Sequence, residues 1–235
     1  MPGLPALIRV GHRGAPAVAK DNTLASFDAA LAIGVDMIEF DVLPARGGSG
    51  ELYLAHDYRA LDEARSPTLA AALAHFATAP FAGVRLQLDI KRRGVEREVI
   101  AALDESAVRE RAFISTGVRG VLARFRELAP DIGRGWTVPD LPLVNDVPGL
   151  REPYRSRIPG RAAARLRAGE ITALVPHWSI VDRRLVEVVG GAGGEIYAWT
   201  VNDASRIARL AALGVTGVIT NDPRLFAAIE QTEAL

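Results

Sequence analysis

The sequence predicts an α/β fold, specifically a TIM (β/α)8 barrel, from three observations. Short apolar runs alternate with Ala- and Leu-rich amphipathic segments along nearly the whole chain of 235 residues. Strands that alternate with helices imply parallel pairing through βαβ units. Roughly eight such units in about 200–250 residues match this barrel, whereas a doubly wound sheet normally closes with fewer. We therefore expect one barrel domain over residues 1–235.

The predicted strands are short runs rich in apolar residues. They are Leu7–Val10, Met37–Val42, Leu52–Ala55, Val84–Ile90, Ala112–Ser115, Ile132–Gly135, Ile171–Val175, Glu195–Thr200 and Gly217–Ile219. Because the flexible sequence Gly47-Gly48-Ser49-Gly50 precedes Leu52–Ala55, we expect that run to form a hairpin with the strand before it. The hairpin extends the second βα unit and adds no unit to the barrel.

The predicted helices carry apolar residues on one side, with the 3.6-residue period of a helix. Leu24, Phe27 and Leu31 form such a stripe in the first helix. The helices are Thr23–Ile33, Leu69–Thr78, Val95–Glu105, Val118–Leu128, Arg161–Ala168, Asp182–Val189, Ala204–Leu213 and Pro223–Gln231. Each follows a strand, so the apolar stripes are expected to face the barrel.

One stretch, Thr137–Gly160, departs from this alternation. It holds prolines at positions 139, 142, 148, 153 and 159, and proline at this density blocks both a helix and a central strand. A linker between two domains would explain the stretch, but the same βα alternation continues on both flanks. We therefore expect a long βα loop over one mouth of the barrel.

Composition excludes several classes of protein. Lys and Arg number 28 against 28 Asp and Glu, so the net charge gives no sign of a nucleic-acid or anionic membrane partner. The absence of cysteine excludes a disulfide framework, a thiolate nucleophile and a Cys-ligated metal site. No apolar run approaches the roughly 20 residues of a membrane span, and the first residues do not resemble a signal peptide. We expect a cytoplasmic protein.

Polar residues follow the predicted strands at their carboxyl ends, where function gathers on this fold. Gly11-His12-Arg13-Gly14 comes directly after the first strand. A titratable histidine beside a permanent cation, between two glycines that let the backbone approach a ligand, suits a turn that handles phosphate. A solvated loop with a chance histidine explains this tetrapeptide equally well.

Carboxylates occur at the ends of two successive main strands. Glu39 and Asp41 share one strand face, because residues i and i+2 point the same way. Asp89 and Lys91 repeat the arrangement on the next main strand. Carboxylates inside a barrel repel each other unless a cation lies between them, and oxygen ligands suit Mg²⁺ or Ca²⁺. The alternatives are a buried salt bridge with one solvated acid for the first pair, and a surface pair for the second.

Three further histidines and a tryptophan complete the candidates. His56, followed by Asp57, would form an acid–base pair with a second histidine near a cation. His75 falls within a helical stripe and is expected at the surface or in helix packing, and His177 is expected to line the pocket. For Trp199, packing against substrate and packing in the core are equally good interpretations. Together these groups predict a metal-assisted site for a phosphoester.

Six short motifs occur in order along nearly the entire chain. They are His12-Arg13-Gly14, Asp21-Asn22-Thr23-Leu24, Gly34-x-Asp36-x-x-Glu39-x-Asp41-Val42, His56-Asp57, Trp199-Thr200-Val201-Asn202 and Gly214-Val215-x-Gly217-Val218-Ile219-Thr220. This combination resembles the glycerophosphodiester phosphodiesterase family. The resemblance implies a TIM barrel that hydrolyses glycerophosphodiesters to an alcohol and glycerol phosphate with one divalent cation, Mg²⁺ or Ca²⁺.

Carried over residue by residue, the resemblance also implies roles for the site residues. The catalytic acid–base pair would be His12 and His56, the metal ligands Glu39, Asp41 and Asp89, and the phosphate- or substrate-binding residues Arg13, Lys91, Asn22 and Trp199. The partner would be a small-molecule phosphodiester.

Departures from the family pattern bear on these roles. Asp21 stands where glutamate is usual. Asp89 stands where the third metal carboxylate is usually glutamate, and because its side chain is shorter, a cation bound there would shift or admit a water. Only Tyr58–Ser66 separates the second histidine motif from the next helix, where the family inserts a sizeable segment. We expect a shortened insertion after the second strand and a more open mouth. Asn221 stands where aspartate is frequent and is expected to be structural.

Two alternatives to the hydrolysis of small glycerophosphodiesters stay open. A lysophospholipase D-like or sphingomyelinase D-like enzyme would cleave bulkier lipids, and the short connection and the proline-rich stretch favour it. A non-catalytic phosphate-binding barrel would be expected to have lost polar site residues, yet the histidines, arginine and lysine are all present. The motifs do not distinguish Mg²⁺ from Ca²⁺, or water from a glycerol hydroxyl as the nucleophile.

Overall fold

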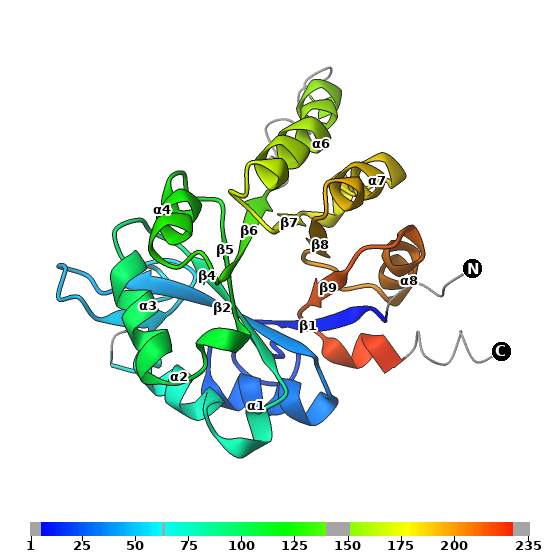
Figure 1. The fold of residues 1–235 in the computed structure, drawn as a ribbon. Coiled ribbons are helices and arrows are strands. Elements are labelled where there is room, and N and C mark those ends of the chain that lie inside the picture. The colour runs from blue at the N-terminus through cyan, green and yellow to red at the C-terminus, as the bar shows by residue number, and fades with distance from the viewer. Residues whose placement is uncertain (1–5, 63, 140–150, 228–235) are drawn as a thin grey trace.

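The computed structural model describes residues 6–62, 64–139 and 151–227, and strands from this part of the chain form a closed barrel (Figure 1). Its parallel strands are β1 (Ile8–His12), β2 (Met37–Pro44), β4 (Arg85–Ile90), β5 (Ala112–Thr116), β6 (Gly133–Val138), β7 (Ala173–Pro176), β8 (Glu195–Ala198) and β9 (Gly217–Thr220). They are joined in the order β1-β9-β8-β7-β6-β5-β4-β2, and the pairing of β1 with β2 closes the ring. The predicted TIM (β/α)8 fold is confirmed.

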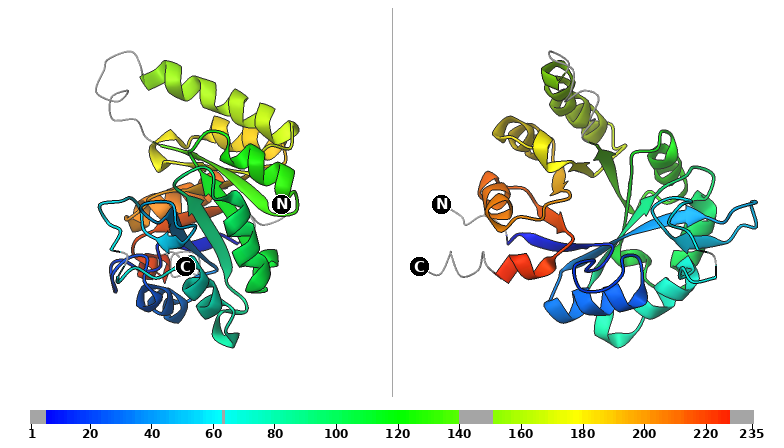
Figure 2. Two further views of the ribbon diagram at one scale, coloured as in Figure 1. Left: turned by 90° about the vertical axis from the view of Figure 1, so that its left-hand side faces the viewer. Right: turned by 180° about the vertical axis from the view of Figure 1, so that it is seen from behind.

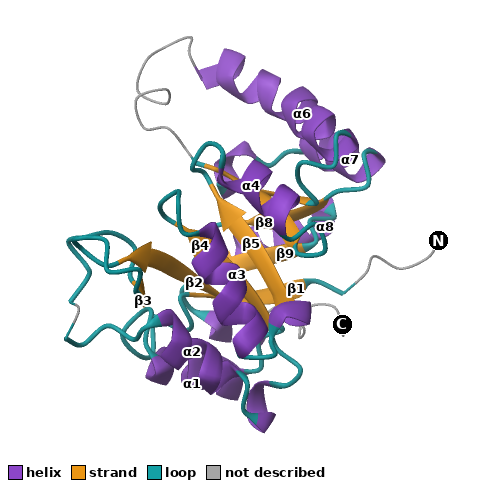
Figure 3. Ribbon diagram, turned by 60° about the vertical axis from the view of Figure 1, so that its left-hand side comes forward, coloured by secondary structure: helices purple, strands orange, loops and turns teal. Residues whose placement is uncertain are grey.

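The third predicted strand forms the expected hairpin. β3 (Leu52–Leu54) pairs antiparallel with the end of β2, with Val42 opposite Leu54. Gly47 and Gly48 take φ values of 82° and 75° in the turn, a conformation that other residues rarely adopt. Figure 3 shows β2 running beyond the other strands with β3 beside it. The hairpin therefore stands at the carboxyl end of β2, next to the mouth of the barrel.

Helices cover the outside of the barrel (Figures 1 and 2). They are α1 (Leu24–Ile33), α2 (Leu69–Phe76), α3 (Glu96–Glu105), α4 (Val121–Leu128), α6 (Arg151–Arg167), α7 (Arg183–Gly191) and α8 (Ala204–Leu213), with 3₁₀ turns η1 (Ala79–Phe81), η2 (Arg109–Arg111), η3 (Trp178–Ile180) and η4 (Pro223–Phe226). Thr23 and Asp203 cap the starts of α1 and α8, and Gly34 and Gly214 end them in the left-handed conformation. Among the described helices, none is long and apolar enough to cross a bilayer.

Two apolar layers hold the barrel together. The larger layer lies between strands and helices, where Phe27, Phe40 and Phe76 are fully buried with ring centroids 4.8–5.7 Å apart. The smaller consists of Val10, Met37, Phe113, Ala173, Val175, Tyr197 and Ile219. Met37 shares its strand face with Glu39, so this layer fills the interior beneath the polar carboxyl end.

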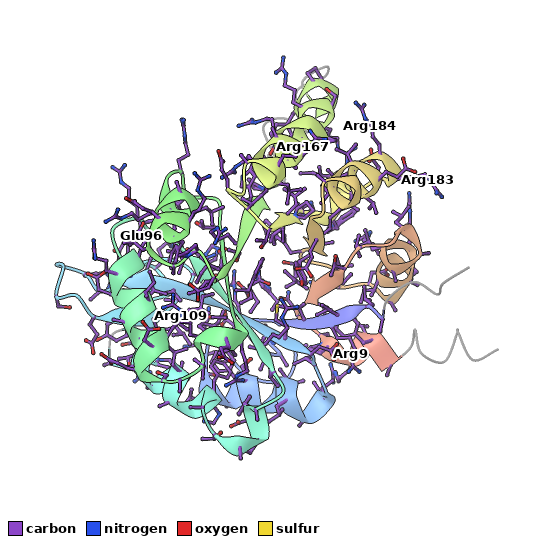
Figure 4. All side chains as sticks on the ribbon, viewed as in Figure 1. Arg9, Glu96, Arg109, Arg167, Arg183 and Arg184 are labelled. Atoms are coloured by element: carbon purple, nitrogen blue, oxygen red, sulfur yellow. The ribbon has the colours of Figure 1, made fainter. Side chains whose placement is uncertain are left out.

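The outer faces of α6 and α7 are basic. Figure 4 shows the side chains of Arg167, Arg183 and Arg184 pointing away from the strands. All three are exposed. These charges therefore lie outside the barrel and away from its interior.

The stretch Thr137–Gly160 is less irregular than predicted. β6 extends to Val138, and α6 begins at Arg151 and passes through Pro153 and Pro159. Pro153 lies in the first turn, where its missing N–H has no helical partner to lose. Pro159 removes one hydrogen bond inside the helix, and burial of the apolar side of the helix offsets that loss. The loop expected over the mouth falls on residues 140–150, which lie outside the described residues.

Two helix starts also differ from the prediction. α4 begins at Val121 and not at Val118, because Gly120, with a φ of 87°, turns the chain just before it. The predicted last helix, Pro223–Gln231, starts as the 3₁₀ turn η4. Its part beyond residue 227 lies outside the described residues.

Candidate active site

Charged side chains from β1, β2, β4 and the loops after them meet at the carboxyl end of the barrel. They border a cavity that opens to solvent and encloses about 410 Å³ of empty space, solvent included. The lining residues are His12, Arg13, Glu39, His56, Gln87, Asp89, Lys91, Thr137, Val175, Trp199 and Ile219. Asp41 is fully buried and contacts two of them, Arg13 and Lys91. The predicted acids, cations and catalytic histidines therefore gather in one place.

The turn after β1 depends on a glycine. A side chain at Gly14 would lie 2.4 Å from Ser26 Oγ, and its φ is +90°. Arg13 itself takes a φ of 54°, which is strained for a residue with a Cβ. Ser26 Oγ supports this shape by donating to the carbonyl oxygen of Arg13 at 2.9 Å. The turn thereby directs the backbone N–H of Arg13 to Glu39 Oε2, 2.9 Å away.

Three carboxylates face one another across β2 and β4. Glu39, Asp41 and Asp89 each offer an oxygen within 4.8 Å of the others. The parallel register sets Gln87 beside Glu39 and Asp89 beside Asp41, and alternation along each strand turns all four side chains inward. Burial, and then the neighbouring Asp41 and Asp89, raise the pKa of Glu39 well above its ordinary value. The acids of the cluster therefore disfavour one another's ionised forms.

Two cations, Lys91 and Arg13, compensate part of this negative charge. Their contacts with Asp41 are ion pairs and lack the alignment of hydrogen bonds. Lys91 Nζ lies 2.6 Å from Asp41 Oδ1 and 2.5 Å from Asp89 Oδ2. Arg13 Nε lies 2.9 Å from Asp41 Oδ2. Although burial alone would raise the pKa of Asp41, Lys91 and Arg13 hold it below its ordinary value. Burial alone would lower the pKa of Lys91, but Asp89 and Asp41 raise it, so the ammonium group stays charged.

The donor set fits a hard divalent cation. Three carboxylates face two permanent cations, which leaves one negative charge uncompensated. The raised pKa of Glu39 reflects the same deficit of positive charge. Oxygen donors favour Mg²⁺ or Ca²⁺ over softer metals. A divalent cation among these acids would make the site net positive and suited to an anionic phosphodiester.

His12 is nearly enclosed at the end of β1. Its Nδ1 lies 2.5 Å from Asn221 Oδ1. Burial, with the charge of Arg13 second, lowers the pKa of His12 to about 4, so the ring is neutral at pH 7. Because an amide oxygen only accepts, Nδ1 carries the proton and Nε2 is left as an acceptor, 3.8 Å from Glu39 Oε2.

His56 reaches the cavity from the loop after β3. Its side chain is 47% exposed, and Nδ1 lies 3.4 Å from Asp57 Oδ2. Asp57 is held in turn by the backbone N–H groups of Arg59 and Ala60, at 2.8 and 3.0 Å. The two histidines thus differ, since one is enclosed beside an amide and the other exposed beside a carboxylate.

Asn22 and Asp21 have protein partners in this structure. The amide of Asn22 donates to Asp41 Oδ2 at 2.8 Å and accepts from the Asp41 N–H at 3.1 Å, so both of its ends are used. Asp21 Oδ2 lies 3.3 Å from Arg13 Nη1. Asn22 therefore orients a carboxylate and Asp21 orients a guanidinium. The expected contact of Asn22 with phosphate stays a prediction.

The side chain of Trp199 forms part of the cavity wall, and His177 packs behind it. Trp199 lines the cavity and donates from Nε1 to the carbonyl oxygen of Val175 at 2.9 Å. His177 does not line this cavity, contrary to the prediction, because its ring packs edge-on against Trp199 at 5.7 Å. His75 lies outside the site and binds Asp28 at 2.7 Å, which agrees with the predicted surface position.

Sequence reasoning missed four polar residues of the site, among them Thr137, which lines the cavity and donates to Asp89 Oδ1 at 3.3 Å. Gln87 shares its strand face with Asp89, so the same period-two alternation could have found it. Ser115 closes a predicted strand and donates to Asp89 Oδ1 at 2.8 Å. Asn221, expected to be structural, binds His12 across 209 positions of sequence, and no local pattern predicts that contact.

Known proteins resemble this chain along its length. The model of the Glycerophosphoryl diester phosphodiesterase family matches residues 12–75 and 51–225. A glycerophosphodiester phosphodiesterase of Arabidopsis thaliana is 27% identical over 255 residues, which cover 92% of this chain and 70% of the relative. A glycerophosphodiester phosphodiesterase of Caldanaerobacter subterraneus is 26% identical over 249 residues, covering 91% and 93%.

Solved structures share the barrel. A glycerophosphodiester phosphodiesterase from Parabacteroides distasonis has a TM-score of 0.76 at 17% identity, covering 97% of this chain and 98% of that one. An Oleispira antarctica phosphodiesterase, solved in complex with the product sn-glycerol-3-phosphate, has a TM-score of 0.71 at 24% identity, covering 99% and 98%. At these identities the likeness shows a common fold.

Proposed function

The chain belongs to the glycerophosphoryl diester phosphodiesterase family, and on that premise we propose that it hydrolyses glycerophosphodiesters to an alcohol and glycerol phosphate with one divalent cation. One observation carries the proposal. Three carboxylates, two permanent cations and two histidines meet in and beside one cavity. A barrel that only bound phosphate would need the cations, but it would not need a pair of histidines with opposite surroundings.

Arg13 and Lys91 bind the phosphodiester oxygens. Both keep their positive charge, and both already lie on the carboxylate cluster, so they are fixed before substrate arrives. They offset the negative charge that grows on the equatorial oxygens as the nucleophile attacks. Glu39, Asp41 and Asp89 would hold a divalent cation, which would supply Lewis-acid charge to the phosphodiester.

The two histidines move protons at opposite ends of the reaction. His12 Nε2 takes the proton of the nucleophile, which is water or a neighbouring glycerol hydroxyl, as a new bond to phosphorus forms. His56 gives a proton to the alcohol oxygen as its bond to phosphorus breaks. The neutral ring of His12 favours the role of base, and the exposed ring of His56 beside Asp57 favours that of an acid that regains its proton from solvent.

Turnover of glycerophosphocholine tests the proposal. We expect glycerol phosphate to be released with Mg²⁺ or Ca²⁺, to stop with a chelator, and to resume when the cation is added back. ³¹P NMR during the reaction distinguishes the nucleophiles, because a cyclic phosphate forms only if a glycerol hydroxyl attacks. A purified protein that binds phosphate but releases no product from any glycerophosphodiester would contradict the proposal.

A bulkier lipid diester is the second candidate substrate. The short connection Tyr58–Ser66 favours it, because little chain is available there to cover the leaving alcohol. Comparing kcat/KM for glycerophosphocholine and lysophosphatidylcholine separates the two. A higher value for lysophosphatidylcholine would assign the enzyme to lipids.

A further inference from the structure

Gln87 holds a buried oxygen that has no partner. The residue is 1% exposed on β4 and borders the cavity with Glu39 and Asp89. Its Oε1 accepts no hydrogen bond from any residue that the structure describes. A buried acceptor left in this state is typically destabilising by about 1–3 kcal/mol. The position therefore calls for a ligand that the protein itself does not supply.

Ser115 decides which end of the Gln87 amide is free. The hydroxyl of Ser115 has one hydrogen, which it donates to Asp89 Oδ1 at 2.8 Å. Ser115 Oγ can then only accept from Gln87, whose Nε2 lies 3.0 Å away. A reversed amide would set two acceptors against each other. The hydrogen bonds thus leave Oε1 as the unpaired end.

Asp89 is already occupied by donors on both oxygens. Oδ1 accepts from Ser115 and also from Thr137 Oγ1 at 3.3 Å, and Oδ2 lies 2.5 Å from Lys91 Nζ. Its capacity to bind a cation is therefore shared with other groups. An amide oxygen is a hard, uncharged ligand that Ca²⁺ takes readily.

We propose that Gln87 Oε1 is a further ligand of the divalent cation, added to Glu39, Asp41 and Asp89, and that Ser115 positions it. The inference rests on the cation of the proposed function and names a ligand outside the carboxylate set. Register supports it, because Gln87 lies directly beside Glu39 on the neighbouring strand. A fourth oxygen without added charge favours Ca²⁺, which takes more ligands than Mg²⁺ takes from protein.

Calorimetric titration with CaCl₂ and MgCl₂, without substrate, tests this ligand. Gln87→Met keeps the length of the side chain but removes the hard oxygen, and we expect 10–100-fold weaker Ca²⁺ binding, the range typical of groups that support a metal site. Gln87→Glu restores an oxygen and is expected to restore binding. His75→Gln, outside the site, is the control and keeps the wild-type affinity.

The outcomes separate this ligand from its alternatives. Unchanged Ca²⁺ affinity in folded Gln87→Met overturns the inference, whether or not KM for the diester rises. If Gln87→Met does not fold, Ser115→Ala, which releases the amide, should weaken Ca²⁺ binding several-fold, and unchanged affinity there overturns it equally. If the wild-type protein binds no cation, both this ligand and the cation of the proposed function are overturned. If a chelator does not reduce turnover, only the cation dependence of the proposed function is overturned.

An independent observation concerns three residues on the loops at the carboxyl end of the barrel, Arg46, Tyr58 and Arg92, which we call the cationic rim. The ring of Tyr58 lies 5.8 Å from the guanidinium carbon of Arg46 and 5.4 Å from that of Arg92. Arg46 also donates to the carbonyl oxygen of Tyr58, and Arg92 to that of Lys91 at 3.0 Å. The rim therefore joins the loops that follow β2, β3 and β4, which also carry His56 and Lys91.

Arg92 is placed to bind an anion. It is exposed and forms no ion pair with any residue in the described part of the chain. Its neighbour in the sequence, Lys91, lines the cavity. A guanidinium steadied on an aromatic ring presents its remaining N–H groups in a fork that matches phosphate or carboxylate.

We infer, on the basis of the proposed function, that the preferred substrate carries a second phosphate on its alcohol half, which the cationic rim binds. Tyr58 of the rim follows, by two positions in the sequence, His56, the residue that protonates that alcohol in the proposed reaction. A quaternary ammonium head group would meet like charge in the same place. Doubly charged diesters are therefore expected to be better substrates than choline esters.

Competing the two kinds of diester tests the rim. We expect kcat/KM for bis(glycerophospho)glycerol to exceed that for glycerophosphocholine at least 10-fold at low salt, and the ratio to fall as ionic strength rises. Arg92→Gln should reduce the ratio several-fold, mainly through KM. Arg65→Gln, which removes an exposed arginine paired with Asp62 on the same loop, should leave it unchanged.

The ratio decides the inference about the rim. Equal kcat/KM values, or a ratio that Arg92→Gln leaves unchanged, would overturn the rim while the proposed hydrolysis stands. Turnover of neither diester would overturn both.

Discussion

The strands β1 and β2 carry charge at both ends, and the two ends differ in how that charge is balanced. At the amino end Arg9 Nε and Nη2 each lie 3.0 Å from an oxygen of Asp36, and the Arg9 N–H donates at 2.8 Å (Figure 4 labels Arg9). At the carboxyl end three carboxylates outnumber two cations. The balanced end serves the fold, and the unbalanced end leaves negative charge that a bound cation would offset. Unmatched charge, more than charge itself, marks the functional end.

Arg134 extends the comparison at the amino end of the barrel. It is buried and donates to the carbonyl oxygens of Pro130 and Ile132, at 3.0 and 2.7 Å. It also donates to those of Gly169 and Glu170, each at 3.3 Å. An arginine there satisfies backbone groups, whereas Arg13 at the other end is paired with carboxylates beside the cavity.

Replacing His12 with alanine should have the largest effect. It removes the proposed base, and we expect kcat to fall on the order of 10²–10⁴-fold, with the far-UV circular dichroism spectrum unchanged. His75→Ala is the matched control and should keep wild-type kcat. A fully active His12→Ala protein would exclude this residue as the base.

Replacing Glu39 with glutamine should separate stability from function at the same end. The change relieves repulsion among buried carboxylates, so the chelator-treated variant should unfold at a higher temperature than chelator-treated wild type. Wild type should gain about 2.7 kcal/mol at a cation concentration 100 times Kd, and the variant much less. Thermal unfolding with and without Ca²⁺ measures both effects. A variant that Ca²⁺ still stabilises like wild type would remove Glu39 from the ligand set.

Replacing Arg134 with methionine should lower stability and leave catalysis unchanged, which is the opposite of the effect expected for Glu39→Gln. Buried carbonyl oxygens would lose their donor, and we expect the free energy of unfolding to fall by about 2–3 kcal/mol. Urea denaturation measures this loss. The kcat of the folded fraction should equal that of wild type. A large loss of kcat at unchanged stability would contradict the assignment of the amino end to stability and the carboxyl end to function.

Replacing Asp36 with asparagine should have the smallest effect. Burial would raise the pKa of Asp36, but Arg9 holds it below its ordinary value, so the ionised form stabilises the fold. Since the pair is partly exposed, we expect a loss of about 1 kcal/mol or less at pH 7. This contribution is present above about pH 4 and disappears as the pH falls through the lowered pKa. Urea denaturation should therefore show wild type and variant converging in acid, and a difference that grows in acid would contradict the assignment.

Local pattern was sufficient for the strands that carry the carboxylates. Alternation put Glu39 and Asp41 on one face, and the next main strand put Asp89 on the same side, as the structure shows. Their role as ligands stays a prediction. The same reasoning failed at Pro159, because the number of prolines in a segment says nothing about the buried contacts that keep α6 helical.

The sequence by itself determined the barrel and the gathering of acids, histidines and cations at one end, because strand and helix periods are local and parallel strands share a carboxyl end. Only the tertiary structure decided the neutral state of His12, its contact with Asn221, and the free oxygen of Gln87. Those properties depend on burial and on partners 209 and 28 positions away in sequence. The barrel must close before these groups meet.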